Sequence, residues 1–76
     1  MNSNNFILVN EEYWGKGEYE THPVWINVRQ IISISSFTAY INGVNRNAKS
    51  KVIIGGATIY LIEDPQELFK LMDKKD

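Results

Sequence analysis

Three residues with metal-ligand chemistry alternate immediately before the first proline of the chain. Glu18, Glu20 and His22 stand two residues apart, so in an extended segment all three side chains project from one face. Two carboxylates and an imidazole can ligate a divalent metal ion, but the sequence shows no second set of residues that would orient them. The same spacing is typical of a solvated strand edge before Pro23. We predict the strand edge and no metal site.

Groups for covalent or acid–base catalysis are scattered along the chain. It has no cysteine and a single histidine, and nothing pairs that histidine with a serine. Glu63 and Asp64 are adjacent carboxylates, but adjacent strand residues point to opposite faces. Gly55-Gly56 lies between two apolar runs, whereas phosphate-binding glycine loops lead from a strand into a helix. We therefore predict that the protein is not an enzyme and has no catalytic residues and no cofactor.

Basic residues with no acidic residue among them occupy the middle of the chain, and two aromatic residues, Phe37 and Tyr40, lie between them. Cations contact phosphates and rings stack on bases, so nucleic acid is the alternative partner. The net charge of −1 provides no general attraction to polyanions, and an ordinary exposed hairpin arm explains the same residues. The candidate basic patch consists of Arg29, Arg46, Lys49 and Lys51.

The elements that position these residues are clearest in the last third of the chain. Two apolar runs flank Gly55-Gly56, and this pair suits a two-residue hairpin loop because both glycines accept positive φ. One face of the hairpin is then apolar throughout and the other is mixed, as expected for a sheet with one core face. The predicted register pairs Ile54 with Ala57, Val52 with Ile59 and Ser50 with Leu61.

A short helix is predicted directly after this hairpin. Asp64 is a suitable N-cap, Pro65 suits the first helical position, and Glu67 completes a capping box. A helix of about ten residues is marginal in water, so it must pack on the sheet. The predicted apolar stripe is formed by Leu68, Phe69, Leu71 and Met72.

The first half of the chain predicts further strands. The apolar run Phe6–Val9 reads as the first strand. Gly15 and Gly17 indicate a turn within the acidic, aromatic segment 11–21, with short strand arms on either side. Pro23 marks a strand start or an edge strand. Residues 24–28 alternate, with Trp25 on the face away from the core.

Two connections in the middle of the chain are less regular. Residues 27–30 are predicted to form a turn rather than a bulge, because an unbroken strand through them would exceed ten residues. Asn42-Gly43 is typical of a type I′ turn that closes a hairpin with arms 31–41 and 44–54. That register would pair Ile34 with Lys51, so a bulge or an irregular stretch must intervene. Residues 45–50 are polar and predicted to be exposed.

A second apolar surface is predicted on the back of the Gly55-Gly56 hairpin and beside it. Such surfaces mark contacts with another chain, and a chain of this size gains support from self-association. Alternatively, segment 11–21 folds over this face and closes it within the monomer. The candidate interaction surface consists of Trp14, Trp25, Ile53, Tyr60 and Ile62.

Residues 24–34, 52–56 and 59–68 together resemble the small flagellar FlbD-type (swarming motility) proteins. Those proteins run as an apolar strand ending in Asn, a turn, a strand, a glycine-containing hairpin and a short helix. The chain departs from them in segment 35–50 and in its longer N-terminal part. The resemblance implies a non-enzymatic cytoplasmic accessory protein and carries over no functional residues, because the shared positions are structural.

The sequence thus predicts a single α+β domain over residues 1–76. We expect a small antiparallel β-meander or curled sheet of four to five strands with one C-terminal helix, a disordered start at 1–5, and a protruding loop or hairpin arm at 36–50. No apolar run is long enough to span a membrane and no signal peptide is recognised, so the predicted location is the cytoplasm. The predicted partner is another protein or a second copy of the chain.

Overall fold

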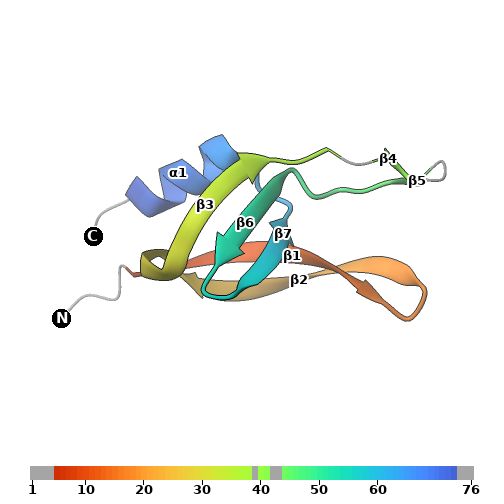
Figure 1. Ribbon diagram of the computed structural model, residues 1–76, viewed down its shortest axis with the longest axis horizontal. Helices are drawn as coiled ribbons and strands as arrows, with labels where there is room; N and C mark the ends of the chain where they lie inside the picture. The colour runs from red at the N-terminus through yellow and green to blue at the C-terminus, as the bar shows by residue number, and fades with distance from the viewer. Residues whose placement is uncertain (1–4, 39, 42–43, 74–76) are drawn as a thin grey trace.

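The computed structural model describes residues 5–38, 40–41 and 44–73. It confirms the predicted α+β class: a five-stranded antiparallel sheet, a two-stranded arm and one C-terminal α-helix (Figure 1). The strands are β1 (Phe6–Gly15), β2 (Glu18–Asn27), β3 (Ile31–Ser36), β4 (Tyr40–Ile41), β5 (Val44–Asn45), β6 (Ser50–Ile54) and β7 (Ala57–Leu61), and the helices are η1 (Val28–Gln30) and α1 (Pro65–Asp73).

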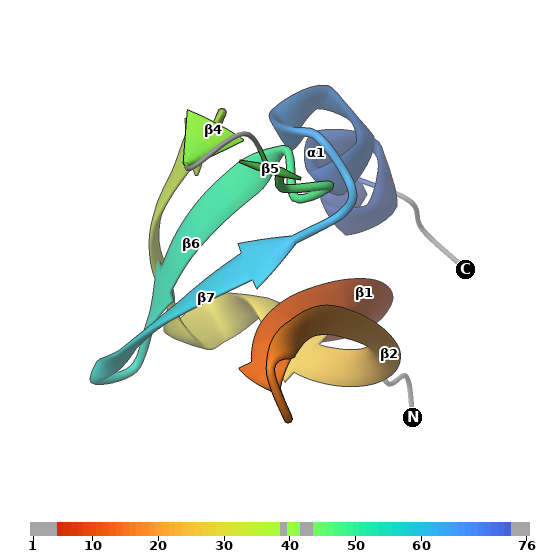
Figure 2. The same ribbon diagram turned by 90° about the vertical axis from the view of Figure 1, so that its right-hand side faces the viewer.

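The main sheet has the order β2-β1-β7-β6-β3, so its two edge strands, β2 and β3, are consecutive in the chain. In a flat sheet of five strands these edges would lie about 19 Å apart. Only the 3-10 helix η1 connects them, and its few residues advance about 6 Å. The sheet must therefore curl so that the end of β2 and the start of β3 come together at η1, and Figure 2 shows the curled sheet from one end. The turn predicted at residues 27–30 is confirmed.

β1 and β2 pair along their whole lengths and form the longest hairpin of the fold. Its turn residues, Lys16 and Gly17, have φ values of 40° and 87°, which is the left-handed region that favours glycine. The turn predicted from the glycines is confirmed, but each arm has ten residues. The strand predicted at Phe6–Val9 is only the first part of β1, because pairing continues through the acidic residues that follow.

Pro23 lies in the middle of β2 without interrupting the hairpin. Its partner is Asn10, whose amide nitrogen donates to the Glu63 carboxylate at 3.0 Å and not to β2. The backbone at position 23 thus faces the free edge of the sheet, where a missing N–H breaks no ladder hydrogen bond. The prediction of an edge strand at Pro23 is confirmed, and the proline also withholds a donor from any chain that would pair with this edge.

The β6–β7 hairpin turns at Gly55-Gly56 in the predicted register. The face predicted to be apolar lines the inside of the curl, where Val52 and Leu61 are fully buried. Alternate residues of β1 and β2 face the same interior, and α1 contributes one further buried side chain. The buried apolar core consists of Ile7, Val9, Ile26, Val52, Leu61 and Leu68.

Helix α1 begins with the predicted capping box. The Glu67 amide donates to Asp64 Oδ1 at 2.8 Å, and the Asp64 amide donates to Glu67 Oε1 at 3.0 Å. Leu68 is buried and Leu71 and Met72 pack against the core, but Phe69 is 53% exposed. Its inclusion in the core stripe is wrong, because a helix this short buries one side against the curled sheet. Among the described residues, no helix is long and apolar enough to cross a membrane.

The segment between β3 and β6 contains the predicted irregular stretch. Ser36 pairs with Ser50 and Tyr40 pairs with Asn45. The segment from β5 to β6 is therefore one residue longer than the segment from β3 to β4. The arm β4–β5 projects toward the same end of the molecule as the β1–β2 turn (Figure 1). The predicted Asn42-Gly43 turn and residues 1–4 of the predicted disordered start at 1–5 lie outside the described residues, whereas the Asn5 carbonyl accepts a hydrogen bond from the Val28 amide at 2.6 Å. The prediction that residues 45–50 are exposed is wrong for Ala48 and Ser50, which are 3% and 0% exposed.

We expect Asp64→Ala to lower the free energy of unfolding by about 1 kcal/mol, because the first turn of α1 loses its cap. Chemical denaturation measures this change. Asp73→Ala, at the exposed end of the same helix, is the matched control and should change stability by less than about 0.5 kcal/mol. Equal effects of the two substitutions would contradict a capping role for Asp64.

Candidate functional site

Glu12 is a buried carboxylate, with 2% of its surface exposed. It lies on β1 opposite Tyr60 of β7, and its side chain points to the outer face of the sheet, away from the core. An unpaired carboxylate at this depth would be strongly unfavourable. Its burial therefore requires partners from a segment that covers the outer face, and the segment that follows β5 provides them.

Residues 46–48 surround the Glu12 carboxylate with donors. Arg46 Nε donates to Glu12 Oε1 at 3.0 Å, the Asn47 amide to Oε2 at 2.9 Å and the Ala48 amide to Oε1 at 3.3 Å. Both carboxylate oxygens are thus satisfied, and no buried polar side-chain atom in the described part of the chain lacks a partner. Charge-assisted hydrogen bonds of this kind are stronger than neutral ones, so Glu12 holds this segment on the sheet.

The guanidinium of Arg46 is enclosed by three aromatic rings. Its Cζ lies 4.2 Å from the Tyr19 ring centroid, 5.0 Å from that of Phe37 and 4.6 Å from that of Tyr60. Phe37 and Tyr60 also contact each other, with ring centroids 4.6 Å apart. We call Tyr19, Phe37 and Tyr60 the aromatic cage. The Arg46 side chain, which fills this cage, is 11% exposed.

The sheet register explains why these rings meet although they are distant in the sequence. Glu12 and Tyr60 are directly opposed on β1 and β7. Tyr19 is opposed to Trp14, which lies two residues after Glu12 and hence on the same face. Phe37 follows β3 on the far side of Tyr60 and completes the cage. Strands β1, β2 and β7 thus contribute side chains to one site on the outer face, and β3 and β5 lead into it.

Arg46 therefore has a different environment from the other residues of the predicted basic patch. Its guanidinium is paired with Glu12 inside the cage, whereas Arg29, Lys49 and Lys51 are exposed. Tyr60 of the predicted interaction surface is likewise covered, by Arg46 and Phe37. Sequence reasoning missed Glu12, because a glutamate in an alternating acidic segment reads as solvated.

A second region of the outer face is open. Phe6, Leu8 and Trp25 are 48%, 47% and 63% exposed, and Leu8 is directly opposed to Trp25 across the β1–β2 hairpin. We call these three residues the outer apolar patch. The sequence predicted only Trp25 on this surface. The signal for the other two is the unbroken apolar run that begins β1, because alternate residues of a strand must face outward.

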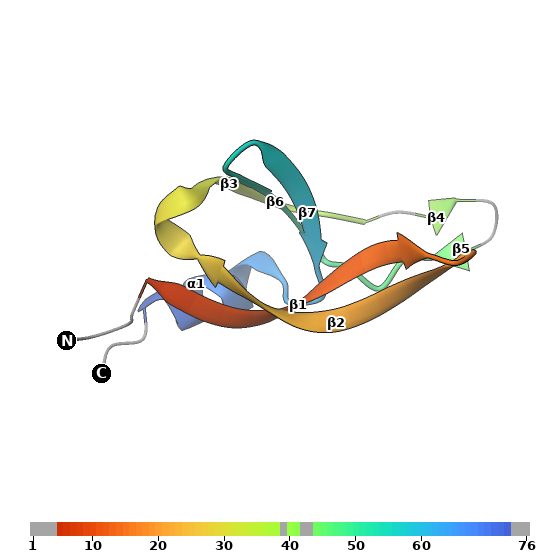
Figure 3. The same ribbon diagram turned by 90° about the horizontal axis from the view of Figure 1, so that it is seen from below.

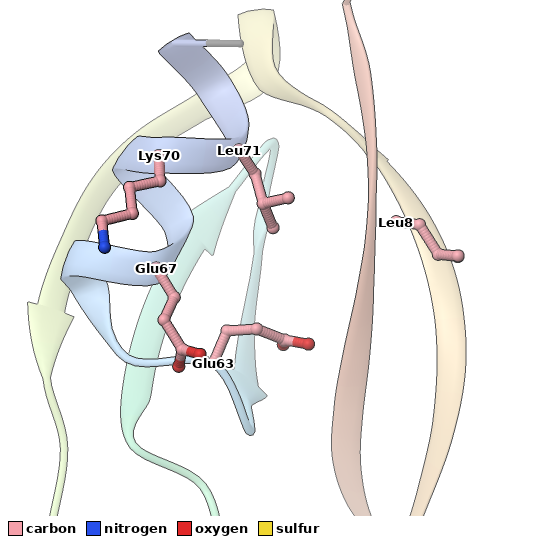
Figure 4. Close-up of a pocket in the computed structure, with 5 residues that line it drawn as sticks. All are labelled: Leu8, Glu63, Glu67, Lys70 and Leu71. Atoms are coloured by element: carbon pink, nitrogen blue, oxygen red, sulfur yellow. The ribbon is translucent and has the colours of Figure 1, made fainter.

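The outer apolar patch continues into a shallow groove between β1 and α1. The groove has a volume of about 510 Å³, and Leu8 belongs to both features. The Glu63 carboxylate in its wall accepts a hydrogen bond from Asn10 Nδ2 at 2.9 Å. Figure 4 shows the residues that line the groove, which are Leu8, Glu63, Glu67, Lys70 and Leu71.

The other residues of the predicted interaction surface lie apart from this patch or are partly covered. Trp14 is 62% exposed near the tip of the β1–β2 hairpin, where it contacts Tyr19 edge-to-face with ring centroids 4.9 Å apart. Figure 3 shows how far this tip extends from η1, which lies at the opposite end of the hairpin. Ile53 and Ile62 are half-buried. The five predicted residues therefore do not form one continuous exposed surface.

The residues predicted as a charged strand edge make cross-strand pairs within the hairpin. His22 Nε2 lies 3.4 Å from Glu11 Oε1, and Tyr13 donates its hydroxyl to Glu20 Oε1 at 3.1 Å. The hydrogen bond to Glu20 raises the pKa of Tyr13 above its ordinary value. Within the described ranges, no group of three or more potential ligands is arranged to hold a metal ion.

Comparison with known proteins finds no matching family model, no matching curated protein and no matching solved structure. The resemblance to the FlbD-type proteins thus stays a prediction from the sequence.

We expect Glu12→Gln to lower the free energy of unfolding by about 3 kcal/mol, because it removes one charge of a largely buried ion pair. Chemical denaturation measures the loss. Glu11→Gln on the same strand is the control: its pair with His22 is partly exposed, so its loss should stay below about 0.5 kcal/mol. A Glu12→Gln protein as stable as the control would contradict the structural role of Glu12.

The Tyr13–Glu20 hydrogen bond predicts a pH effect. It favours the protonated phenol in the folded state, so its contribution is present below the ordinary tyrosine pKa and is lost as pH rises through the raised pKa of Tyr13. In an NMR titration, the Tyr13 ring should deprotonate at higher pH than in the Glu20→Gln variant. An unchanged titration would show that the hydrogen bond does not persist in solution.

Proposed function

We propose that the chain is a non-catalytic interaction module that binds another protein chain, or a second copy of itself, through the outer apolar patch. The observation that carries this proposal is the arrangement of Phe6, Leu8 and Trp25 as neighbours on one sheet face, each about half exposed or more. Exposed large apolar side chains that stand singly need no explanation, whereas a contiguous group marks a contact surface.

The composition of the patch supports a protein as its partner. Protein interfaces are enriched in aromatic residues and depleted of charged residues at their centres, and this patch contains two aromatic rings and one aliphatic side chain. Three ionisable residues, Glu63, Glu67 and Lys70, line the groove that adjoins the patch at Leu8. A partner would therefore bury an apolar centre and meet polar groups at the rim, which is the usual organisation of such contacts.

The division of the outer face further supports the proposal. The guanidinium of Arg46 packs against Tyr19, Phe37 and Tyr60 and leaves Phe37 and Tyr60 partly buried. The outer apolar patch has no equivalent covering segment among the described residues. The alternative, a nucleic-acid-binding regulator, has no comparable support, because Arg46 of the basic patch is paired with Glu12.

We expect Trp25→Ala to weaken self-association or partner binding at least tenfold while it changes stability by no more than about 0.5 kcal/mol. Light scattering over a concentration series tests self-association, and affinity capture followed by titration of the captured protein tests a partner. Trp14→Ala is the matched control, because Trp14 is equally exposed but lies near the hairpin tip.

The proposal makes a clear distinction between the two tryptophans. Trp14→Ala should leave association unchanged. A chain that stays monomeric at high concentration and captures no protein through Trp25 would contradict the proposal. Equal loss of binding in both variants would contradict its location on the outer apolar patch.

A further inference from the structure

The environment of Arg46 has the chemistry of a binding site rather than that of an ordinary surface ion pair. The carboxylate of Glu12, whose side chain is 1% exposed, accepts a hydrogen bond from Arg46 Nε. The centroids of three aromatic rings lie within 5.0 Å of Arg46 Cζ. Cations gain free energy over aromatic faces, most of all where they are desolvated. The surrounding side chains would therefore attract a cation whether or not it is covalently part of this chain.

The geometry favours a guanidinium over an ammonium ion. A guanidinium is planar, so its faces stack on aromatic rings while its edge donates to a carboxylate. Arg46 uses both properties: its edge contacts Glu12 and its plane lies among Tyr19, Phe37 and Tyr60. An ammonium is a strongly hydrated point charge, so it would lose more hydration in the same place and gain less stacking.

We propose that Glu12 and the aromatic cage form a receptor for a guanidinium group, which Arg46 fills within the chain and which accepts the arginine side chain of another molecule when Arg46 is absent. This site is separate from the outer apolar patch and does not depend on the function proposed there. The ligand class is the guanidinium group, carried by free guanidinium or by an arginine residue.

Two features allow the site to persist without the Arg46 side chain. The Asn47 and Ala48 amides hold both oxygens of Glu12 independently of it, at 2.9 and 3.3 Å. Phe37 and Tyr60 contact each other directly. The site also reaches the surface, because the Arg46 side chain is 11% exposed and Tyr19 is 36% exposed.

The test uses the Arg46→Ala protein and guanidinium chloride at millimolar concentration, with sodium chloride at equal ionic strength as the reference. Guanidinium should raise the ratio of folded to unfolded protein in a saturable way, by about elevenfold at ten times its Kd. Arginine amide should act similarly and lysine amide much less. In the wild-type chain, whose site is full, guanidinium should show no saturable stabilisation.

The double variant Arg46→Ala with Glu12→Gln separates the receptor from a general salt effect, because it keeps the rings and removes the carboxylate charge. Guanidinium should no longer stabilise it. If Arg46→Ala does not fold alone, guanidinium should refold it as judged by circular dichroism, and Arg46→Gln, which keeps the methylene stem, undergoes the same titration. A response to guanidinium no larger than that to sodium, or the same in the double variant, would overturn the proposal.

Discussion

The ion pair between Glu12 and Arg46 is the interaction on which the arrangement of the outer face depends. The carboxylate is buried on a sheet face that has no core of its own, so it is tolerated only with the donors of residues 46–48 in place. Those donors come from the segment that leads from the β4–β5 arm back into β6. One side chain on β1 thus determines where a segment more than thirty residues later lies.

This constraint divides the outer face into two regions with different properties. One region contains the aromatic cage, in which Arg46 lies against all three rings; Phe37 and Tyr60 are partly buried there, and Tyr19 stays 36% exposed. The other contains Phe6, Leu8 and Trp25 and stays exposed. Both regions are rich in aromatic residues, so their composition does not explain the difference. They differ because Arg46 packs against the rings of one region and no cation packs against the other among the described residues. The region around Arg46 holds the segment after β5 on the sheet, and the open region is the surface through which we propose that a partner binds.

Much of the fold was predictable because local signals agreed with the tertiary structure. Gly55-Gly56 set the β6–β7 register, and Asp64 with Glu67 set the start of α1. Both depend on residues within a few positions of each other. Phe69 was assigned to the core because helical spacing alone does not show how wide a face the curled sheet covers. The length of the β1–β2 hairpin was underestimated because acidic residues obscured its alternation.

The Glu12 site was not predictable for a different physical reason. Its groups lie at positions 12, 19, 37, 46 and 60, and only the sheet register brings them together. A glutamate among other acidic residues gives no sign of burial, and an arginine in a basic segment gives no sign of an internal partner. Trp25 was assigned to the outer surface correctly by alternation, and the same rule applied to Phe6–Val9 would have identified Phe6 and Leu8.

Amide hydrogen exchange at Asn47 and Ala48 tests the central role of Glu12 most directly. Both amides belong to a segment outside the regular strands and donate to the Glu12 carboxylate. We expect slow exchange at both amides in the wild-type protein. In Glu12→Gln we expect fast exchange at both, under conditions where the Val52 and Leu61 amides stay protected. Fast exchange at Asn47 and Ala48 in the wild-type protein would contradict this role of Glu12.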